Sequence, residues 1–465
     1  MKKILIPLFL LFSINSFSQE ISCDNASVVD AYNLAVNTVN INVRRGILAA
    51  GAEYGGEWAR DISINSWFGV SLLNPKVAEA SLWSVTENKD KIGHQYWDRI
   101  IWVISALNHY KVTGDEAFLK KAFTCSANSM TVLEKEAWDA QYGMFTGPSV
   151  FNDGIAGYPA PVWDSTNGSG FVLDHKNAKV IKCLSTNCVY YGAYLSLIEM
   201  GQILKVDKAQ LLTFQTKADA LKANILKNLY SEADNKLYYL IDNTGAVAKY
   251  QEGLGVSFAI IFGILTNEQT QKLLKDVKVS KYGITSIYPD FARFSPDKPG
   301  RHNNIIWPMV NGFFAQAAIK ANNKTSFDTE FNGLTKLALD QDKGNYQFWE
   351  IYNPYTGKPD GGWQGAHWHS CMIQTWSATA YMNMIEYGVA GLRFDNNGIS
   401  FVPYLPENIH NIELRNIKYR QSVLNVAIKG KGSKIKLFTV NGKAQSNYKI
   451  DATAKGVNTI QIELE

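Results

Sequence analysis

The sequence predicts a mainly α-helical protein that ends in a small antiparallel β domain. Between residues 27 and 385, apolar residues recur every three to four positions in segment after segment, as they do on one face of a helix. Long loops rich in glycine, proline and aromatic residues separate these segments, and long loops in compact domains are usually functional. From about Gly391 apolar and polar residues alternate instead, which is typical of half-buried strands. An array of helical hairpins followed by a β domain is therefore expected.

The first predicted helix covers Ser27 to Arg44, where Ala31, Leu34 and Ala35 begin the apolar stripe. A glycine-bearing loop follows before the next helix. The other segments with helical periodicity are Ile62–Leu73, Tyr96–Tyr110, Glu116–Trp138, Asn187–Leu204, Leu211–Tyr230, Val256–Leu265, Asn311–Ala321, Phe327–Leu339 and Met372–Ile385.

Five C-terminal segments show the strand pattern, with turn sequences such as Asn441-Gly442 between them. They are Ile399–Val402, Ile412–Tyr419, Ser422–Lys429, Lys434–Val440 and Thr459–Glu463. We therefore expect a helical domain over residues 19–390 and a β domain over residues 391–465.

Residues 1–18 are predicted to be a secretory signal peptide. Lys2 and Lys3 supply the charged start, residues 4–12 an apolar run, and residues 16–18 a small-x-small cleavage site. No later segment is apolar over the roughly 20 residues that a membrane-spanning helix needs. A periplasmic or secreted protein is expected, with no membrane contact after cleavage.

Composition and cysteine content exclude several classes of function. The formal net charge of +4 is small for 465 residues, and scattered basic residues give no reason to expect a nucleic-acid partner. Cys183 and Cys188 are a candidate disulfide, with five mostly buried thiols as the alternative. His367 and His369 lack the accompanying spacing of a metal site, so we expect neither metal nor cofactor. A monomer is expected.

Three loops carry candidate catalytic acids. The first holds Glu53, Glu57 and Asp61, the second Asp164 flanked by Asp153 and Asp174, and the third Glu350 between Trp349 and Tyr352. Hydrolysis of a glycoside needs one carboxylic acid to protonate the leaving oxygen and one carboxylate to activate water or to attack the sugar. A carboxyl group beside tryptophan suits the first task, because desolvation raises its pKa.

Aromatic and polar residues near these acids are suited to bind sugars by stacking and hydrogen bonding. His302 and Asn303 precede Trp307, and Trp363 and Trp368 follow Glu350. A helix-capping loop and a buried aromatic helix are the purely structural alternatives for these two segments.

Four motifs resemble those of the six-hairpin (α/α)6-toroid glycosidases, the group that holds glycoside hydrolase families 63 and 37 (trehalases), glucoamylases and glycogen-debranching enzymes. They are Trp58-Ala59-Arg60-Asp61, Val162-Trp163-Asp164-Ser165, His302-Asn303 with Trp307-Pro308, and Trp349-Glu350-Ile351-Tyr352-Asn353-Pro354. The resemblance covers roughly residues 54–381. Asn304 replaces the usual glycine of the third motif, and residues 167–185 depart from the family pattern of the second.

The resemblance implies an (α/α)6 toroid and an inverting, exo-acting hydrolase of α-linked glucosides or related oligosaccharides. Asp164 would then be the general acid and Glu350 the general base, with their carboxyls roughly 6.5–9.5 Å apart. Asp174 and Glu57 are alternatives for the acid. The residues that would bind substrate are Trp58, Arg60, Asp61, Trp163, His302, Asn303, Trp307, Trp349, Tyr352, Trp363 and Trp368.

Two other functions compete with hydrolysis. Related toroids also support polysaccharide lyases and unsaturated-uronide hydrolases, which act on acidic sugars. A non-catalytic carbohydrate-binding protein would retain the aromatic residues and bind a sugar without turnover.

Overall fold

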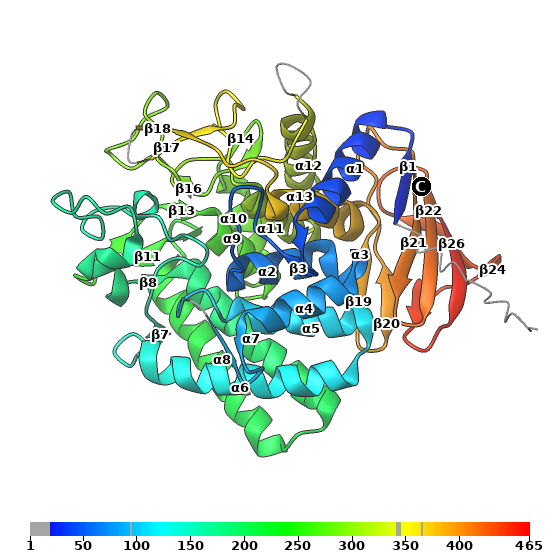
Figure 1. The fold of residues 1–465 in the computed structure, drawn as a ribbon, viewed down its shortest axis with the longest axis horizontal. Helices are drawn as coiled ribbons and strands as arrows, with labels where there is room; N and C mark the ends of the chain where they lie inside the picture. The colour runs from blue at the N-terminus through cyan, green and yellow to red at the C-terminus, as the bar shows by residue number, and fades with distance from the viewer. Residues whose placement is uncertain (1–18, 94, 341–345, 364–365) are drawn as a thin grey trace, which may run out of the picture.

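The fold is helical up to Val389, and a C-terminal sheet domain follows from Leu392 (Figure 1). This computed structural model describes residues 19–93, 95–340, 346–363 and 366–465. The predicted signal peptide, residues 1–18, lies outside this range. The predicted class, mainly α with a C-terminal β domain, is confirmed.

Within the described residues every predicted helical segment contains a helix, and two further helices are present that were not predicted. The helices are α1 (Ala26–Ile41), α2 (Ala59–Asn65), α3 (Ser71–Leu73), α4 (Pro75–Ser84), α5 (Ile101–Thr113), α6 (Glu116–Ala137), α7 (Leu184–Leu204), α8 (Lys208–Leu229), α9 (Gly253–Ile261), α10 (Asn267–Asp276), α11 (Pro308–Lys320), α12 (Lys324–Leu339) and α13 (Thr375–Asn383). Two π-helical segments, Ser66–Val70 and Met384–Val389, join α2 to α3 and extend α13. The helix expected over Ile62–Leu73 is therefore interrupted, at the point where Gly69 leaves helical geometry.

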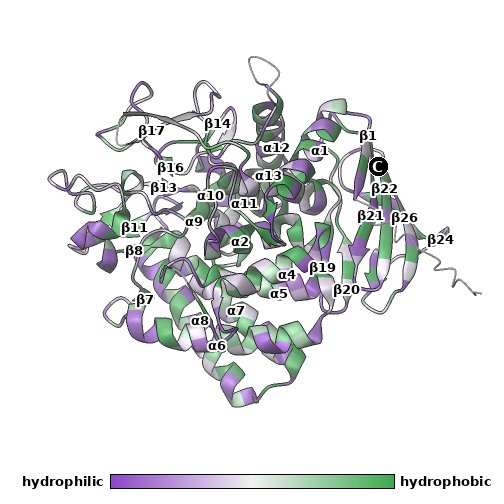
Figure 2. Ribbon diagram, viewed as in Figure 1, coloured by the Kyte–Doolittle hydropathy of each residue, from purple (hydrophilic) through white to green (hydrophobic). Residues whose placement is uncertain are grey.

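One set of helices forms a closed series at the centre of the molecule. α2 packs on α5, α5 on α7, α7 on α9, α9 on α11, α11 on α13, and α13 on α2. Every residue of α2 and of α13 is buried, as expected of helices surrounded by others. Helix α8, by contrast, packs on α7 with a single buried stripe and keeps a polar outer face (Figure 2).

The loops that lead into the central helices meet at one end of the series. Hydrogen bonds join these loops to one another, for example from Ile306 to Tyr352 and from Gly253 to Ser286. In Figure 1 they lie on the side away from the C-terminal sheet. Short strands stiffen them and the other connections: β2 (Val43–Arg44), β3 (Ile47–Leu48), β4 (Thr86–Glu87), β5 (Lys91–Ile92), β6 (Trp138–Asp139), β7 (Met144–Phe145), β8 (Lys182–Cys183), β9 (Tyr230–Ser231), β10 (Lys236–Leu237), β11 (Leu240–Ile241), β12 (Val247–Ala248), β13 (Gln251–Glu252), β14 (Val279–Ser280), β15 (Gly283–Ile284), β16 (Ile287–Tyr288), β17 (Asp360–Trp363) and β18 (Ala366–His369).

The C-terminal domain contains a sheet in the order β1-β21-β22-β26-β23-β24 and a smaller one in the order β19-β20-β25. Its strands are β19 (Leu392–Asp395), β20 (Gly398–Phe401), β21 (Asn411–Tyr419), β22 (Ser422–Lys429), β23 (Ile435–Val440), β24 (Lys443–Ala444), β25 (Lys449–Asp451) and β26 (Gly456–Leu464). The expectation of a purely antiparallel domain is wrong at one pair, because β22 and β26 run parallel. Strand β1 (Glu20–Cys23), which was not predicted, pairs with β21 from the N-terminal side of the chain.

Two further findings concern the sequence predictions. All five cysteines are free thiols, so the candidate disulfide between Cys183 and Cys188 is absent from the described structure. In the part of the chain that the structure describes, no helix has both the length and the apolar character needed to cross a membrane.

Candidate active site

Arg60 is the centre of a buried group of acids at the N-terminus of α2. Its Nη1 donates to Asp98 Oδ2 at 3.1 Å and to Gln95 Oε1 at 2.8 Å, and its Nη2 donates to Asp153 Oδ2 at 2.7 Å. The guanidinium also lies over the ring of Trp58, 5.0 Å from its centroid. The loops before α2, α5 and α7 thus converge on one cation, although their residues are distant in the sequence.

Asp61 differs from the other acids of this group because no described residue donates a hydrogen bond to its carboxyl. Its nearest cationic atom is Arg60 Nε at 3.6 Å, and the residue is only 3% exposed. Burial raises the pKa of Asp61 to about 7, against the attraction of Arg60 and with repulsion from Glu350 and Asp153. The repulsion from Glu350 shows that the first and third predicted loops come together.

Glu350 lies against Arg301, which precedes α11. Arg301 Nη2 is 2.7 Å from both carboxylate oxygens of Glu350 and donates at 3.0 Å to the hydroxyl of Tyr54. The Tyr54 hydroxyl is in turn 3.5 Å from Glu350 Oε2. The backbone of Glu350 is fixed by a hydrogen bond from its N–H to the carbonyl of Cys371. Glu350 is therefore buried, oriented and paired with a cation.

His302 lies between the two groups and is stacked on Trp307. The two rings are parallel within 2°, with centroids 4.3 Å apart, and Trp307 meets the edge of Trp376. Burial lowers the pKa of His302 well below its usual value, with further contributions from Arg301 and Arg60, so the imidazole is neutral at neutral pH. Both ring nitrogens of His302 and Nε1 of Trp307 are buried without a hydrogen-bond partner among the described residues. Buried polar atoms of this kind are costly unless a ligand satisfies them.

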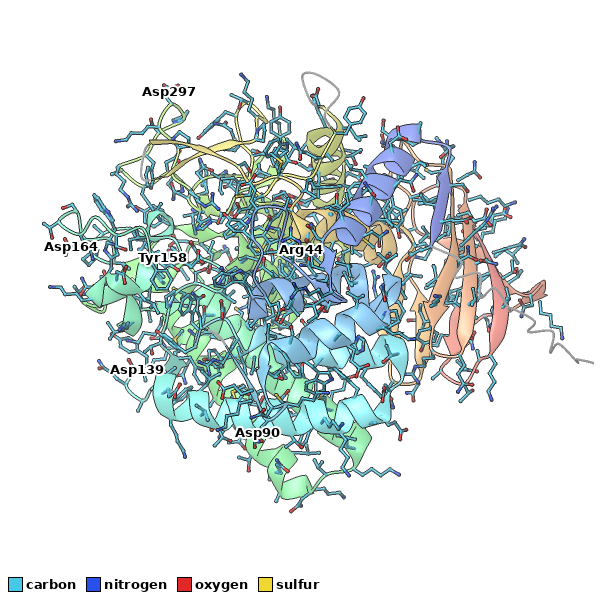
Figure 3. All side chains as sticks on the ribbon, viewed as in Figure 1. Arg44, Asp90, Asp139, Tyr158, Asp164 and Asp297 are labelled. Carbon is cyan, nitrogen blue, oxygen red and sulfur yellow. The ribbon has the colours of Figure 1, made fainter. Side chains whose placement is uncertain are left out.

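The predicted general acid, Asp164, is not joined to this cluster by any hydrogen bond or ion pair between described residues. Its Oδ1 accepts from the backbone N–H of Thr166 at 2.9 Å and from the Thr166 hydroxyl at 2.7 Å. Figure 3 shows Asp164 at the outer tip of its loop. The alternatives lie at the surface as well: Asp174 is exposed and accepts from Ser169 Oγ, and Glu57 is exposed.

The remaining predicted binding residues fall into two sets. Trp163 is stacked under the guanidinium of Arg293, and Tyr352 is fully buried with its hydroxyl bonded to the backbone of Trp349. Asn303 accepts a hydrogen bond from the backbone N–H of Phe291. Trp163, Tyr352 and Asn303 therefore form the first set, whose contacts fix the conformation of the loops that carry them. Trp363 and Trp368 belong to the hairpin β17–β18, and their side chains lie outside the described part.

Four members of the site were not predicted from the sequence: Arg301, Tyr54, Asp98 and Gln95. Arg301 adjoins the predicted His302-Asn303 motif, but its partner Glu350 lies on another loop, 49 residues further on. Asp153 was noted only as a neighbour of Asp164, yet it is the acid of that loop that reaches Arg60.

The cluster contains two carboxyl groups in different surroundings. Glu350 is held by the cation Arg301, and the pKa of Asp61 is raised to about 7. Acid–base hydrolysis uses such a pair. In sequence, the family model of the mannosylglycerate hydrolase MGH1-like glycoside hydrolase domain matches residues 64–377, more than half of the chain. The chain belongs to this MGH1-like glycoside hydrolase family. The predicted resemblance to toroid glycosidases is thereby confirmed.

Other comparisons agree on the fold of this MGH1-like chain. Residues 392–445 match the model of the C-terminal domain of glycosyl hydrolase family 65. No protein of curated function matches the sequence.

Among solved structures, one described as a sialidase has a TM-score of 0.70 at 16% identity. This chain, over 92% of its length, covers 40% of that structure.

Two further structures extend the comparison. The GH78 rhamnosidase of Bacillus sp. GL1 has a TM-score of 0.63 at 13% identity, and 96% of this chain covers 43% of it. The GH63 mannosylglycerate hydrolase of Thermus thermophilus has a TM-score of 0.60 at 12% identity, and 76% of this chain covers 100% of it. The MGH1-like chain thus spans about two fifths of the length of the sialidase and the rhamnosidase.

Proposed function

We propose that the protein is an inverting glycoside hydrolase that removes α-linked glucosyl or related sugar units from the end of an oligosaccharide. The observation that carries this proposal is Glu350, buried and held by Arg301, near Asp61, whose pKa is raised to about 7 by burial, in a chain of the MGH1-like family. The central helices pack one on the next in a closed series, and the loops that lead into them carry the site residues. This arrangement supports an (α/α)6 toroid.

In the proposed reaction Glu350 is the general base. Its carboxylate takes a proton from a water molecule, whose oxygen attacks the anomeric carbon. The bond from that carbon to the glycosidic oxygen breaks, and the general acid gives its proton to the leaving oxygen. One attack by water inverts the anomeric configuration.

We assign the general acid to Asp61 in place of Asp164. Asp61 is buried and its pKa of about 7 keeps it protonated in mildly acidic solution. Asp153 is engaged in an ion pair with Arg60 at 2.7 Å. Asp164, by contrast, is engaged by Thr166 at a loop tip.

The substrate-binding role extends to the buried groups without protein partners. His302 and Trp307 present nitrogens that hydroxyl groups of a sugar would satisfy, and Trp58, whose ring packs against the guanidinium of Arg60, would contribute an apolar contact. A site that satisfies such groups with sugar hydroxyls discriminates strongly against sugars that lack them.

Hydrolysis of a panel of glycosides tests the proposal. The panel should include α-glucosides and also a mannosylglycerate, an α-rhamnoside and a sialoside, because similar structures carry those names. We expect release of a terminal sugar from at least one member, and Glu350→Gln should lower kcat by about 10²–10⁴-fold. A folded wild-type protein that cleaves none of them, or an E350Q variant as active as wild type, would contradict the proposal. An ultraviolet-absorbing product would indicate a lyase instead.

We also propose export of the protein, on the basis of the signal sequence at residues 1–18. Fractionation of expressing cells should place the protein outside the cytoplasm, shortened at its N-terminus. Retention in the cytoplasm at full length would contradict export.

A further inference from the structure

The guanidinium of Arg301 makes an unusual contact with Glu350. A single nitrogen, Nη2, lies 2.7 Å from both carboxylate oxygens, and the same nitrogen donates to Tyr54. Arginine commonly pairs with a carboxylate through two nitrogens. Here the second nitrogen, Nη1, is buried without a hydrogen-bond partner among the described residues. Arg301 itself is only 6% exposed.

We propose that Arg301 is the positioning residue of the reaction: through Nη2 it fixes the orientation of the Glu350 carboxylate. The inference rests on the proposed role of Glu350 as the base. A general base must lie within hydrogen-bond reach of the proton that it takes, so the orientation of its carboxylate decides whether it can act.

The other groups that face Glu350 do not hold its carboxylate as Arg301 does. Tyr54 reaches Oε2 only at 3.5 Å, and burial followed by repulsion from Glu350 raises its pKa, so it remains neutral. Burial and the charge of Glu350 likewise raise the pKa of Cys371, to about 12. Asp61 repels Glu350 whenever both are charged. Among the titratable groups that interact with Glu350 in the described structure, Arg301 alone is a cation in contact with it.

The loop that carries Arg301 is built to hold it. The residue precedes His302, whose backbone has a positive φ of 65° and whose ring is fixed against Trp307. Downstream, Ile306 exchanges backbone hydrogen bonds with Tyr352, two residues after Glu350. The loop of the cation and the loop of the base are therefore fixed to each other a few residues after the contact.

Kinetics of Arg301→Lys and Arg301→Met give the first test. The lysine variant keeps a cation without the planar guanidinium, so we expect kcat to fall about 10-fold. The methionine variant removes the cation, and kcat should fall by about 10²-fold or more, because small misplacements of catalytic groups have effects of that size. KM should change less than kcat, and R301K should recover part of the kcat that R301M loses. Arg393→Lys, which alters a buried arginine bonded to the carbonyls of Tyr387 and Leu392, should leave kcat and KM near their wild-type values.

Infrared difference spectroscopy gives a second test that needs no substrate. Subtracting the spectrum of E350Q identifies the carboxylate stretching bands of Glu350, which should shift in R301M because the carboxylate loses its contacts with Nη2, with R301K between R301M and wild type. Arg393→Lys should follow wild type. Identical bands in wild type and R301M, or an unchanged kcat in R301M, would overturn the role of Arg301. If wild-type protein hydrolyses no glycoside, the proposed function fails, and the infrared bands still decide whether Arg301 orients the Glu350 carboxylate.

Discussion

The carboxyl of Asp61 sets the pH range in which the proposed reaction proceeds. Burial raises the pKa of Asp61 to about 7, so the group carries its proton below that pH and loses it above. A general acid must be protonated to act. The rate is therefore expected to fall as pH rises through about 7, and a pH–rate profile of kcat checks this. A rate that is constant from pH 6 to pH 9 would contradict the assignment.

Substitution of the two competing acids separates them. Asp61→Asn removes the proposed proton and should lower kcat by about 10²–10⁴-fold. Asp164→Asn disturbs only a turn at Thr166 and should leave kcat within a few-fold of wild type. The opposite result, with D164N inactive and D61N active, would restore Asp164 as the acid. Circular dichroism of both variants confirms that each is folded.

At the scale of elements, a buried carboxyl fixes the loop before α7 to the start of α9. Glu252 accepts from the backbone N–H of Ser185 at 2.9 Å and from the hydroxyls of Ser149 and Ser185. Burial raises the pKa of Glu252 to about 7 from an unfolded value near 4.5, against the effect of these hydrogen bonds. The folded state therefore keeps a proton that the unfolded state has released between these pH values.

This retained proton makes the stability of the protein depend on pH. The contribution of Glu252 to the free energy of unfolding is present in full below pH 4.5 and is lost as pH rises through about 7. At 1.36 kcal/mol per unit of pKa difference, the loss is about 3 kcal/mol. Urea unfolding at pH 5 and pH 8 should show a smaller difference for Glu252→Gln than for wild type. Glu268→Gln, at an exposed pair on α10, is the matched control and should retain the wild-type difference.

The elements also show which features the sequence could predict. Long amphipathic or apolar segments such as α6 and α7 were predicted within a few residues, because their packing follows from periodicity alone. Helix α10 was missed because its sequence, NEQTQKLLKD, is polar. Its start is defined by a capping box between Thr266 and Gln269. Helix α4 depends similarly on the Asn74 cap and on Pro75 in its first turn.

Contacts between residues of different loops could not be predicted from the sequence. Glu350 and Arg60 stand in recognisable local motifs, so both could be named from sequence. The partner Asp153 becomes visible only when the loop before α7 meets α2, and Arg301 only when the loops before α11 and α13 meet. No local pattern specifies which acid of a loop turns inward. Asp164 adjoins a tryptophan as expected of a buried acid, yet Thr166 holds it in a surface turn.

At the scale of the whole molecule, the helical part and the C-terminal sheet share one hydrophobic core. Strand β1 joins the sheet from the N-terminal side, and Tyr404 and Tyr110 bond across to Asp328 and Asn396. We expect calorimetry to show one cooperative unfolding transition, and a chain truncated after Gly391 to be unfolded. Two separate transitions, or a folded truncated chain, would show that the parts are independent.

Proton NMR of a hydrolysis reaction, recorded from its first minutes, tests the central claim most directly. With the glycoside that the panel identifies, wild-type protein should release a sugar whose first-formed anomer has the configuration opposite to that of the substrate, and E350Q should release almost none in the same time. Retention of configuration, or equal release by E350Q, would contradict the account of Glu350 as a base that activates water.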